Sequence, residues 1–242
     1  DLARQGRPPL SEAIPTRPPD LVHLMHVPTA GLADVRTHLS LLGACLAWTA
    51  PSKVLHPAGK PPSHWAEDHA LEDPEWAEAA AHLLRGLLLE RQWLKTQVGS
   101  AATDMSFLAA AAELFWLRQT AARFHFELLV WDNDPVEDTE ALYQEVLQAA
   151  LTVQTNPLGY TDGLSPGMPW TRRFRAHLFH GMLRHHLLHY FDCDWFQNPR
   201  AGDFVSKLWQ SDGSLGLDGV LEILDSKALR ADNLIEYFEH AF

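Results

Sequence analysis

The sequence predicts a mostly α-helical domain that carries one short edge strand near its N-terminus. Apolar residues recur every three or four positions through most of the chain, for example between Leu32 and Leu46, and this spacing is typical of amphipathic helices. An alternation of period two, which is typical of strands, is found at residues 21–27. Hydrophobic residues make up 46% of the chain and it has nine tryptophans, so it can bury a globular core.

The prolines divide the chain into an arm and one domain. Residues 1–20 contain five prolines. Because proline fixes φ and lacks an N–H donor, we expect an extended arm there, without a folded element. Pro28 ends the expected strand at residues 21–27. Residues 21–242 show no internal repeat and are expected to form a single α-helical domain.

Signals for helix starts and stops place the expected helices. Asp73 followed by Pro74 marks a helix start, because aspartate caps a helix and proline fits its first position. Pro135 is expected to open a later helix in the same way. Prolines and glycines predict loops at residues 50–64 and 155–170. The expected helices cover residues 32–48, 74–97, 104–131, 135–153, 172–191, 201–210, 218–224 and 228–241.

Charge and composition argue against several functional classes. The formal net charge is −12, and a nucleic-acid-binding face needs clustered basic residues, so we expect no nucleic-acid partner. No apolar run approaches the roughly 18 residues of a membrane span. The two cysteines, Cys45 and Cys193, do not indicate a disulfide framework. The sequence does not assign a compartment, although a cytoplasmic location is slightly favoured.

The expected helix at residues 172–191 concentrates potential metal ligands. His185 and His189 lie four positions apart, and His177 and His180 three apart, so each pair shares a helix face. Two imidazoles one turn apart can chelate a transition metal such as zinc. The alternative is that these histidines fill a half-buried helix and are hydrogen-bonded to their neighbours. This alternative is favoured, because no carboxylate lies at the spacing of a known metal motif.

Three segments of the second half carry a resemblance to a known family. They are RFRAHLF at residues 173–179, WFQNPRAGDFVSKLW at 195–209 and LDGVLEIL at 217–224. Together with the order of the expected elements, they make residues 20–242 similar to the C-terminal catalytic half of the thimet oligopeptidase and oligoendopeptidase F family. That family consists of helical, zincin-like zinc peptidases. The resemblance therefore implies an oligoendopeptidase-type helical domain.

The resemblance also identifies a missing catalytic motif. In the family, the helix after the edge strand carries HExxH, whose histidines bind zinc and whose glutamate activates water. The matching residues here are Ser40-Leu41-Leu42-Gly43-Ala44, which lack both histidines and the glutamate. The resemblance assigns the third metal ligand to Glu78, with Glu75 as the next choice. Family members also use tyrosine or histidine in the loop before RFRAHLF, where Tyr160 is the one candidate.

These replacements imply a catalytically inactive module with no metal and no other cofactor. We expect it to act in binding or assembly with a protein or peptide, held in the implied cleft. The candidate cleft residues are Ser40, Leu41, Ala44, Glu78, Tyr160 and Arg175. Family members carry an additional N-terminal helical region. We therefore expect a hetero-oligomer with an N-terminal half or a paralogous active subunit, or a cleaved chain.

Two alternatives stay open. The chain is an active metallopeptidase or another metal-dependent hydrolase if His177, His180, His185 or His189 binds zinc with Asp192 or Asp194. A stoichiometric transition metal would distinguish this reading from the inactive one. Otherwise the chain is an all-α interaction domain unrelated to peptidases, and the histidine-rich helix is a pH-sensitive surface.

Overall fold

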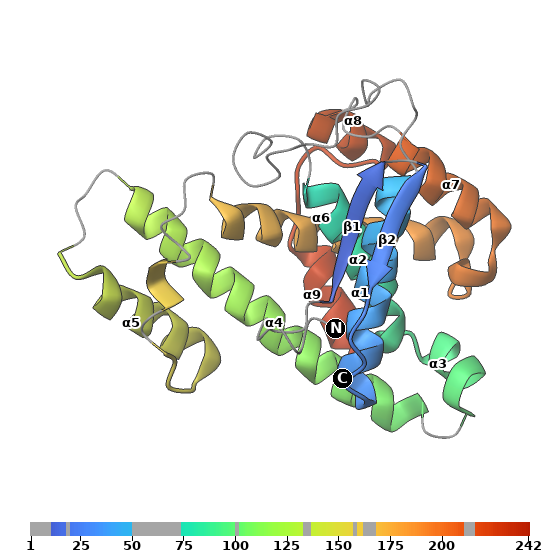
Figure 1. The fold of residues 1–242 in the computed structure, drawn as a ribbon. Coiled ribbons are helices and arrows are strands. Elements are labelled where there is room, and N and C mark those ends of the chain that lie inside the picture. The colour runs from blue at the N-terminus through green and yellow to red at the C-terminus, as the bar shows by residue number, and fades with distance from the viewer. Residues whose placement is uncertain are drawn as a thin grey trace.

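The computed structural model describes residues 11–17, 20–49, 74–99, 102–132, 137–156, 159–161, 168–210 and 216–242. Helices dominate this part of the chain, and one two-stranded sheet lies across helix α1 (Figure 1). The predicted mostly α class is confirmed. The predicted loop at residues 50–64 lies outside the described residues. No described helix is both long enough and apolar enough to cross a membrane.

The sheet pairs β1 (Glu12–Arg17) with β2 (Leu21–Met25) in antiparallel orientation. Strand β2 confirms the predicted strand. The expectation that residues 1–20 hold no folded element is wrong, because β1 lies within them. Its register with β2 is irregular between Pro15 and Arg17. A proline is tolerated at such an irregularity in an edge strand, since its missing N–H is not needed by the ladder there.

Helices α1 (Gly31–Thr49) and α2 (Pro74–Gly86) lie side by side behind the sheet (Figure 1). Gly43 permits their close approach. A Cβ at Gly43 would lie 2.3 Å from the backbone oxygen of Ala80, so any larger residue would push the two helices apart. The glycine therefore sets the distance between α1 and α2, and with it the position of every side chain between them.

The prediction of one continuous helix over residues 74–97 is wrong. It divides into α2, a 3-10 turn at Leu87–Leu89 and α3 (Arg91–Val98). At the break, the backbone oxygen of Gly86 accepts a hydrogen bond of 3.1 Å from the hydroxyl of Tyr237. A Cβ at Gly86 would lie 2.9 Å from that hydroxyl. The end of α2 is therefore the place where Tyr237, which lies far along the chain, donates its hydrogen bond.

Helix α4 (Ala102–Trp131) is the longest element, and α5 (Thr139–Leu151) packs along its C-terminal half (Figure 1). The predicted start of α5 at Pro135 is wrong. Asp138 caps the helix instead, because its carboxylate accepts a 2.9 Å hydrogen bond from the amide of Ala141. Near its middle, α4 carries apolar side chains on several sides. It is not covered on all of them, since Phe115 is 42% exposed.

Helix α6 (Pro169–Phe191) begins three residues before its predicted start. The buried carboxylate of Glu127 on α4 accepts hydrogen bonds from the amides of Trp170 and Thr171, at 2.9 and 2.7 Å. Glu127 thus satisfies two free amides of the first turn from another helix. A 3-10 turn (Trp195–Gln197) and the helices α7 (Pro199–Gln210), α8 (Gly216–Ile223) and α9 (Asp232–Ala241) follow.

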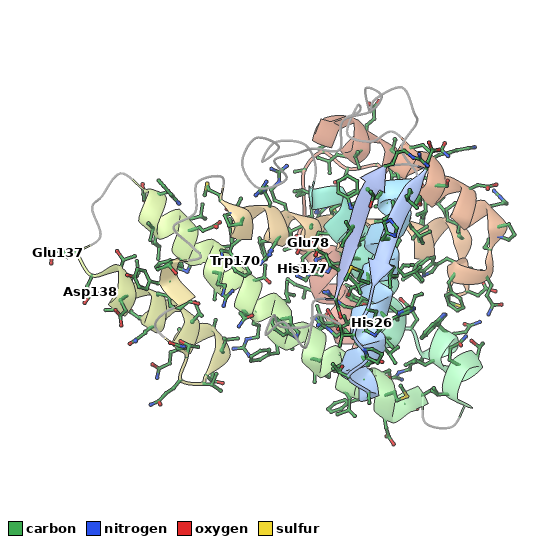
Figure 2. The ribbon with its side chains drawn as sticks, in the orientation of Figure 1. His26, Glu78, Glu137, Asp138, Trp170 and His177 are labelled. Atoms are coloured by element: carbon green, nitrogen blue, oxygen red, sulfur yellow. The ribbon has the colours of Figure 1, made fainter. Side chains whose placement is uncertain are left out.

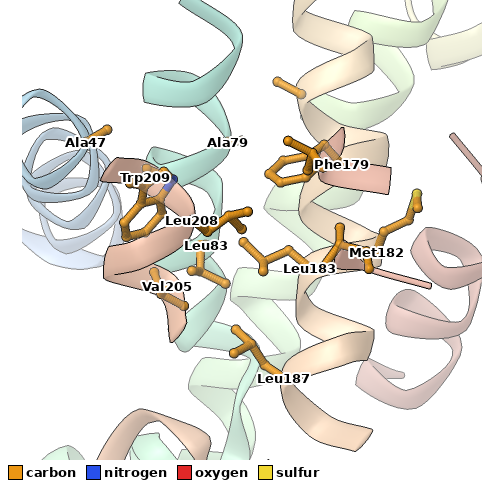
Figure 3. Packing of buried hydrophobic residues seen from close by; sticks show 14 of the residues in the cluster. Ala47, Ala79, Leu83, Phe179, Met182, Leu183, Leu187, Val205, Leu208 and Trp209 are labelled. Atoms are coloured by element: carbon orange, nitrogen blue, oxygen red, sulfur yellow. The ribbon is translucent and has the colours of Figure 1, made fainter. Parts of the chain in front are cut away.

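The main core lies where α2, α6 and α7 meet (Figure 3). Leu83 of α2, Leu183 and Leu187 of α6 and Leu208 of α7 are each at most 3% exposed. A second cluster joins α9 to α3 and α4, and a third joins α4 to α5. Because α6 contributes to the first core along most of its length, its buried face is fixed, and two of its histidines lie on that face.

Candidate functional site

The polar centre of the molecule is built around the carboxylate of Glu113 on α4. Its Oε1 accepts a 2.5 Å hydrogen bond from Nε of Arg36 on α1, and its Oε2 accepts one of 2.9 Å from Nε of Arg85 on α2. Glu113 is 7% exposed. Two guanidinium groups surround this one carboxylate, so its negative charge is compensated and the three side chains together carry one excess positive charge. We call these three residues the ion-pair centre.

Arg85 extends the ion-pair centre toward α1 and toward the histidines. Its Nη1 donates to the hydroxyl of Ser40 at 3.5 Å, and its Nη2 lies 2.6 Å from Nδ1 of His82. A guanidinium can only donate, so Nδ1 of His82 accepts and the ring proton is on Nε2. His82 is therefore neutral, with its protonated nitrogen turned away from Arg85.

Three buried histidines form a cluster beside Arg85. The ring of His82 stacks on His177 of α6 with centroids 3.9 Å apart, and His180 lies 6.1 Å from His82. Burial lowers the pKa of His177 to about 3 and lowers those of His82 and His180 well below their usual range. Arg85 adds to each shift by repelling the charged form. All three rings are neutral at physiological pH.

A small cavity adjoins this histidine cluster. It measures about 10 Å³, room for about one water molecule, and is lined by all three histidines, Arg85 and Tyr237. The Nε2 atoms of His82 and His180 are buried without a hydrogen-bond partner among the described residues. The cavity is too small for a substrate, so the cluster acts as part of the core rather than as an open pocket.

Tyr237 on α9 joins the cluster to a second ion pair. Nε of Arg184 on α6 donates to Glu90 Oε1 at 2.6 Å, and its guanidinium lies 4.2 Å from the centre of the Tyr237 ring. The Tyr237 hydroxyl donates to the Gly86 oxygen, as described above. The segment from α2 to α3 is thereby held against α6 and α9 by the side chains of Arg184 and Tyr237.

Replacing Tyr237 with phenylalanine is expected to lower the free energy of unfolding by about 1–3 kcal/mol. The buried oxygen of Gly86 would lose its side-chain donor, while the ring would keep its packing. Denaturant unfolding measures the change. Tyr190→Phe is the matched control, because the Tyr190 hydroxyl also donates a hydrogen bond, in this case to the carboxylate of Asp225, but Tyr190 is 54% exposed. An equal loss in both variants would contradict the role of the buried bond.

The structure places two of the predicted cleft residues, Ser40 of α1 and Glu78 of α2, near the ion-pair centre. Ser40, Leu41 and Ala44 are half-buried on α1, and the Ser40 hydroxyl also donates to the Arg36 oxygen at 3.0 Å. Glu78 is half-buried on α2, 3.9 Å from His82 Nε2. Figure 2 labels Glu78 of α2 and His177 of α6, and the His177 ring stacks on that of His82.

The other two predicted cleft residues, Tyr160 and Arg175, lie outside α1 and α2. Tyr160 packs against the cluster of α4 and α5 around Phe126, so its assignment to the same cleft is wrong. That cluster lies at the end of the molecule away from α1 (Figure 1). Arg175 is half-buried on α6, two positions before His177. The side chain of Glu75 lies outside the described part of the chain.

The predicted alternative metal site is divided between two faces of α6. His177 and His180 are buried, at 6% and 4% exposure, whereas His185 and His189 are exposed and contact each other with rings 6.4 Å apart. One ion cannot use all four imidazoles. Among the described residues, no group of three or more histidine, cysteine, aspartate or glutamate side chains has a geometry that could hold a metal.

The residues that form this centre were largely missed by sequence reasoning. Arg36, His82, Arg85 and Glu113 were not singled out, although each is a polar residue within an apolar helical run. A charged residue in such a run is a signal of a buried ion pair, because burial without a partner is costly. The sequence does not say which opposite charge is its partner.

Comparisons with protein-family models, with curated proteins and with solved structures found no match for this chain. The assignment of a function therefore rests on the geometry described above. That geometry contains buried ion pairs and neutral imidazoles, which stabilise a fold. Within the described part of the chain, Ser40 makes hydrogen bonds with the Arg36 oxygen and the Arg85 guanidinium, and neither group is a general base.

Proposed function

We propose that this chain is a catalytically inactive, peptidase-like module that binds a protein or peptide segment and uses no metal. The observation that carries the proposal is the contact between Arg85 and Ser40. In the peptidase family that the sequence resembles, the position of Ser40 belongs to a zinc ligand. Here a guanidinium lies against it, and the adjoining carboxylate of Glu113 binds Arg36 and Arg85.

The charges around Ser40 disfavour metal binding there, in agreement with a function that uses no metal. A divalent cation near Ser40 would be repelled by Arg85 and by Arg36. Binding through Nε2 of His82 would need removal of the proton that the Arg85 contact places there. The replacement of a motif glutamate by Leu41 also removes the group that would activate water.

The binding surface in this proposal is the outer face of α1 with strand β2. Val35, Leu42 and Leu46 lie at helical spacing on α1 and are 40%, 37% and 43% exposed. Leu21 and Met25 on β2 are 39% and 37% exposed. A stripe of large apolar side chains on a chain of net charge −12 favours a segment that is apolar and basic. An active paralogue or an N-terminal half could supply such a segment.

The first test combines metal content with a restored motif. The purified chain is expected to hold well below one zinc, iron, nickel, copper or manganese per molecule and to leave a mixed peptide library uncut. A tightly held stoichiometric metal or hydrolysis would overturn the proposal. In an Arg85→Ala background, Ser40→His/Leu41→Glu/Ala44→His is expected to bind zinc at least about tenfold tighter than Leu42→His/Leu46→His. Only the first set would gain Glu78 as a third protein ligand.

The binding function needs its own experiment. Random peptides displayed on phage would be selected on the intact chain and counter-selected on Leu42→Lys/Leu46→Lys. We expect enriched sequences that combine aromatic or aliphatic residues with lysine or arginine and lose affinity at least about tenfold for the variant. His185→Gln is the control, because this exposed residue lies on α6 rather than on α1. Peptides that bind the variant as well as the original chain would place binding elsewhere.

A further inference from the structure

The N-terminal half of α4 has an uncovered apolar face that is independent of the proposed function. Its inner residues, such as Ala109 and Ala110, are at most 2% exposed and belong to the second core cluster. Leu108 and Phe115 are 58% and 42% exposed, and Ala111 lies exposed between them. The steps of three and four residues place these three side chains in one line along the helix.

Neighbouring aromatic residues widen this line into a patch. Phe107 is 54% exposed, and Trp116 is 44% exposed while its ring lies 5.3 Å from the guanidinium carbon of Arg36. Aromatic side chains bury about 150–250 Å² each, so these half-exposed residues and Leu108 leave roughly 400 Å² of apolar surface. A patch of this size equals the largest apolar patch of a typical monomer, which is often functional. We call it the α4 patch.

The α4 patch continues a surface that is already a helix-packing interface. On the C-terminal half of α4, Ala122 and Phe126 pack against Tyr143 and Leu147 of α5. Figure 1 shows α5 along that half, while none of the described helices lies on the outer side of the half leading toward α3. A second helix on the N-terminal half would therefore extend the layer that α5 begins.

Two residues of opposite charge lie at the two ends of the α4 patch, and their spacing suits a second copy of the same helix. Asp104 and Arg118 are both exposed, and each lies seven positions from Ala111, on opposite sides of it. Phe107 and Phe115 each lie four positions from Ala111. A second copy of α4 in antiparallel orientation would thus place aspartate against arginine at both ends and phenylalanine against phenylalanine between them. The small side chain of Ala111 would lie at the crossing, where helix axes approach to about 8–10 Å.

We propose that two copies of this chain form a two-fold symmetric dimer through the α4 patch, antiparallel and centred on Ala111. A closed two-fold interface uses the same surface on both copies, which a self-complementary pattern satisfies. The apolar contribution of roughly 400 Å² per copy is below that of a standard interface of about 800 Å² per partner. The dimer is therefore expected to dissociate in the micromolar range.

Light scattering and sedimentation of the whole 242-residue chain between about 1 and 200 μM would measure this association. We expect a concentration-dependent shift from monomer to dimer. Asp104→Arg is expected to weaken the dimer at least about tenfold, and Asp104→Arg/Arg118→Asp to restore it, because the pairs are only exchanged. Phe115→Glu should abolish it. A chain that stays monomeric over this range would overturn the proposal.

A cross-linking experiment determines the centre of the interface. In a Cys193→Ser background, which removes the exposed cysteine, Ala111→Cys is expected to form a disulfide-linked dimer. Asp104→Cys is the matched control, because two copies of it would lie 14 residues apart along the antiparallel pair, about 21 Å. Equal cross-linking of both variants, or a dimer that neither Ala111→Cys nor Asp104→Arg affects, would overturn the antiparallel arrangement.

Discussion

Below pH 6.5 the chain is expected to lose stability steeply, because His82, His177 and His180 must take up protons when it unfolds. Each ring is neutral in the folded state, and its pKa there is lowered first by burial. In the unfolded chain the three rings return to a pKa near 6.5. The unfolded state then binds more protons than the folded state, so the free energy of unfolding falls as pH decreases.

The expected slope is large. Each buried histidine contributes up to about 1.4 kcal/mol per pH unit, and three together up to about 4 kcal/mol per unit. For His177 the window runs from about pH 6.5 in the unfolded chain down to its folded pKa of about 3. The stabilisation is complete above this window. Most domains have only about 5–15 kcal/mol in total, so acid unfolding near pH 5 is expected.

Denaturant titrations at several pH values measure this slope directly. His177→Gln is expected to lower it by up to about 1.4 kcal/mol per pH unit, whatever its effect on stability at neutral pH. The exposed pair His185→Gln/His189→Gln should leave the slope unchanged. Equal stability at pH 7 and pH 5 in the original chain would contradict buried neutral histidines.

Glu113→Ala is expected to lower the free energy of unfolding by about 3–5 kcal/mol, the second large effect. The variant would leave two guanidinium groups, those of Arg36 and Arg85, buried without their carboxylate. These side chains are only 20% and 11% exposed, so water would compensate poorly. For a domain of this size, the change corresponds to a decrease in Tm of roughly 6–20 °C, which calorimetry would detect.

Two further variants distinguish a buried network from ordinary surface charge. Glu145→Ala on α5 removes an exposed glutamate and should change stability by less than about 0.5 kcal/mol. Arg36→Met/Arg85→Met/Glu113→Leu removes all three charges together and should recover part of the loss, because no buried charge remains unpaired, although Nδ1 of His82 loses its donor. If the triple variant were less stable than Glu113→Ala, unpaired charge would not explain the effect.

Local sequence patterns predicted most helices. They failed where a contact with a residue far along the chain determines the structure. The break at Gly86 accompanies a hydrogen bond from Tyr237, 151 positions away. Strand β1 exists through pairing with β2, which the proline count of residues 1–20 conceals. The start of α5 shows a different limit, because Pro135 and Asp138 are competing local signals. Only the side-chain cap at Asp138 decides between them.

The candidate site was predictable only in part. Ser40, Leu41, Ala44 and Glu78 were predicted to lie near one another, and α1 and α2 do bring Ser40 and Glu78 to the same polar centre through Arg85 and His82. Tyr160 was placed wrongly, because a loop position does not reveal which core its ring enters.

Residue types and the local spacing of apolar residues were enough to predict a mostly helical chain. Which buried charges meet becomes visible only in the folded chain. Glu113 binds arginines from two other helices, and His82 stacks on His177 from a third. Such pairings depend on helix positions set by core packing and by the close contact of Gly43 with Ala80. No local pattern encodes those positions.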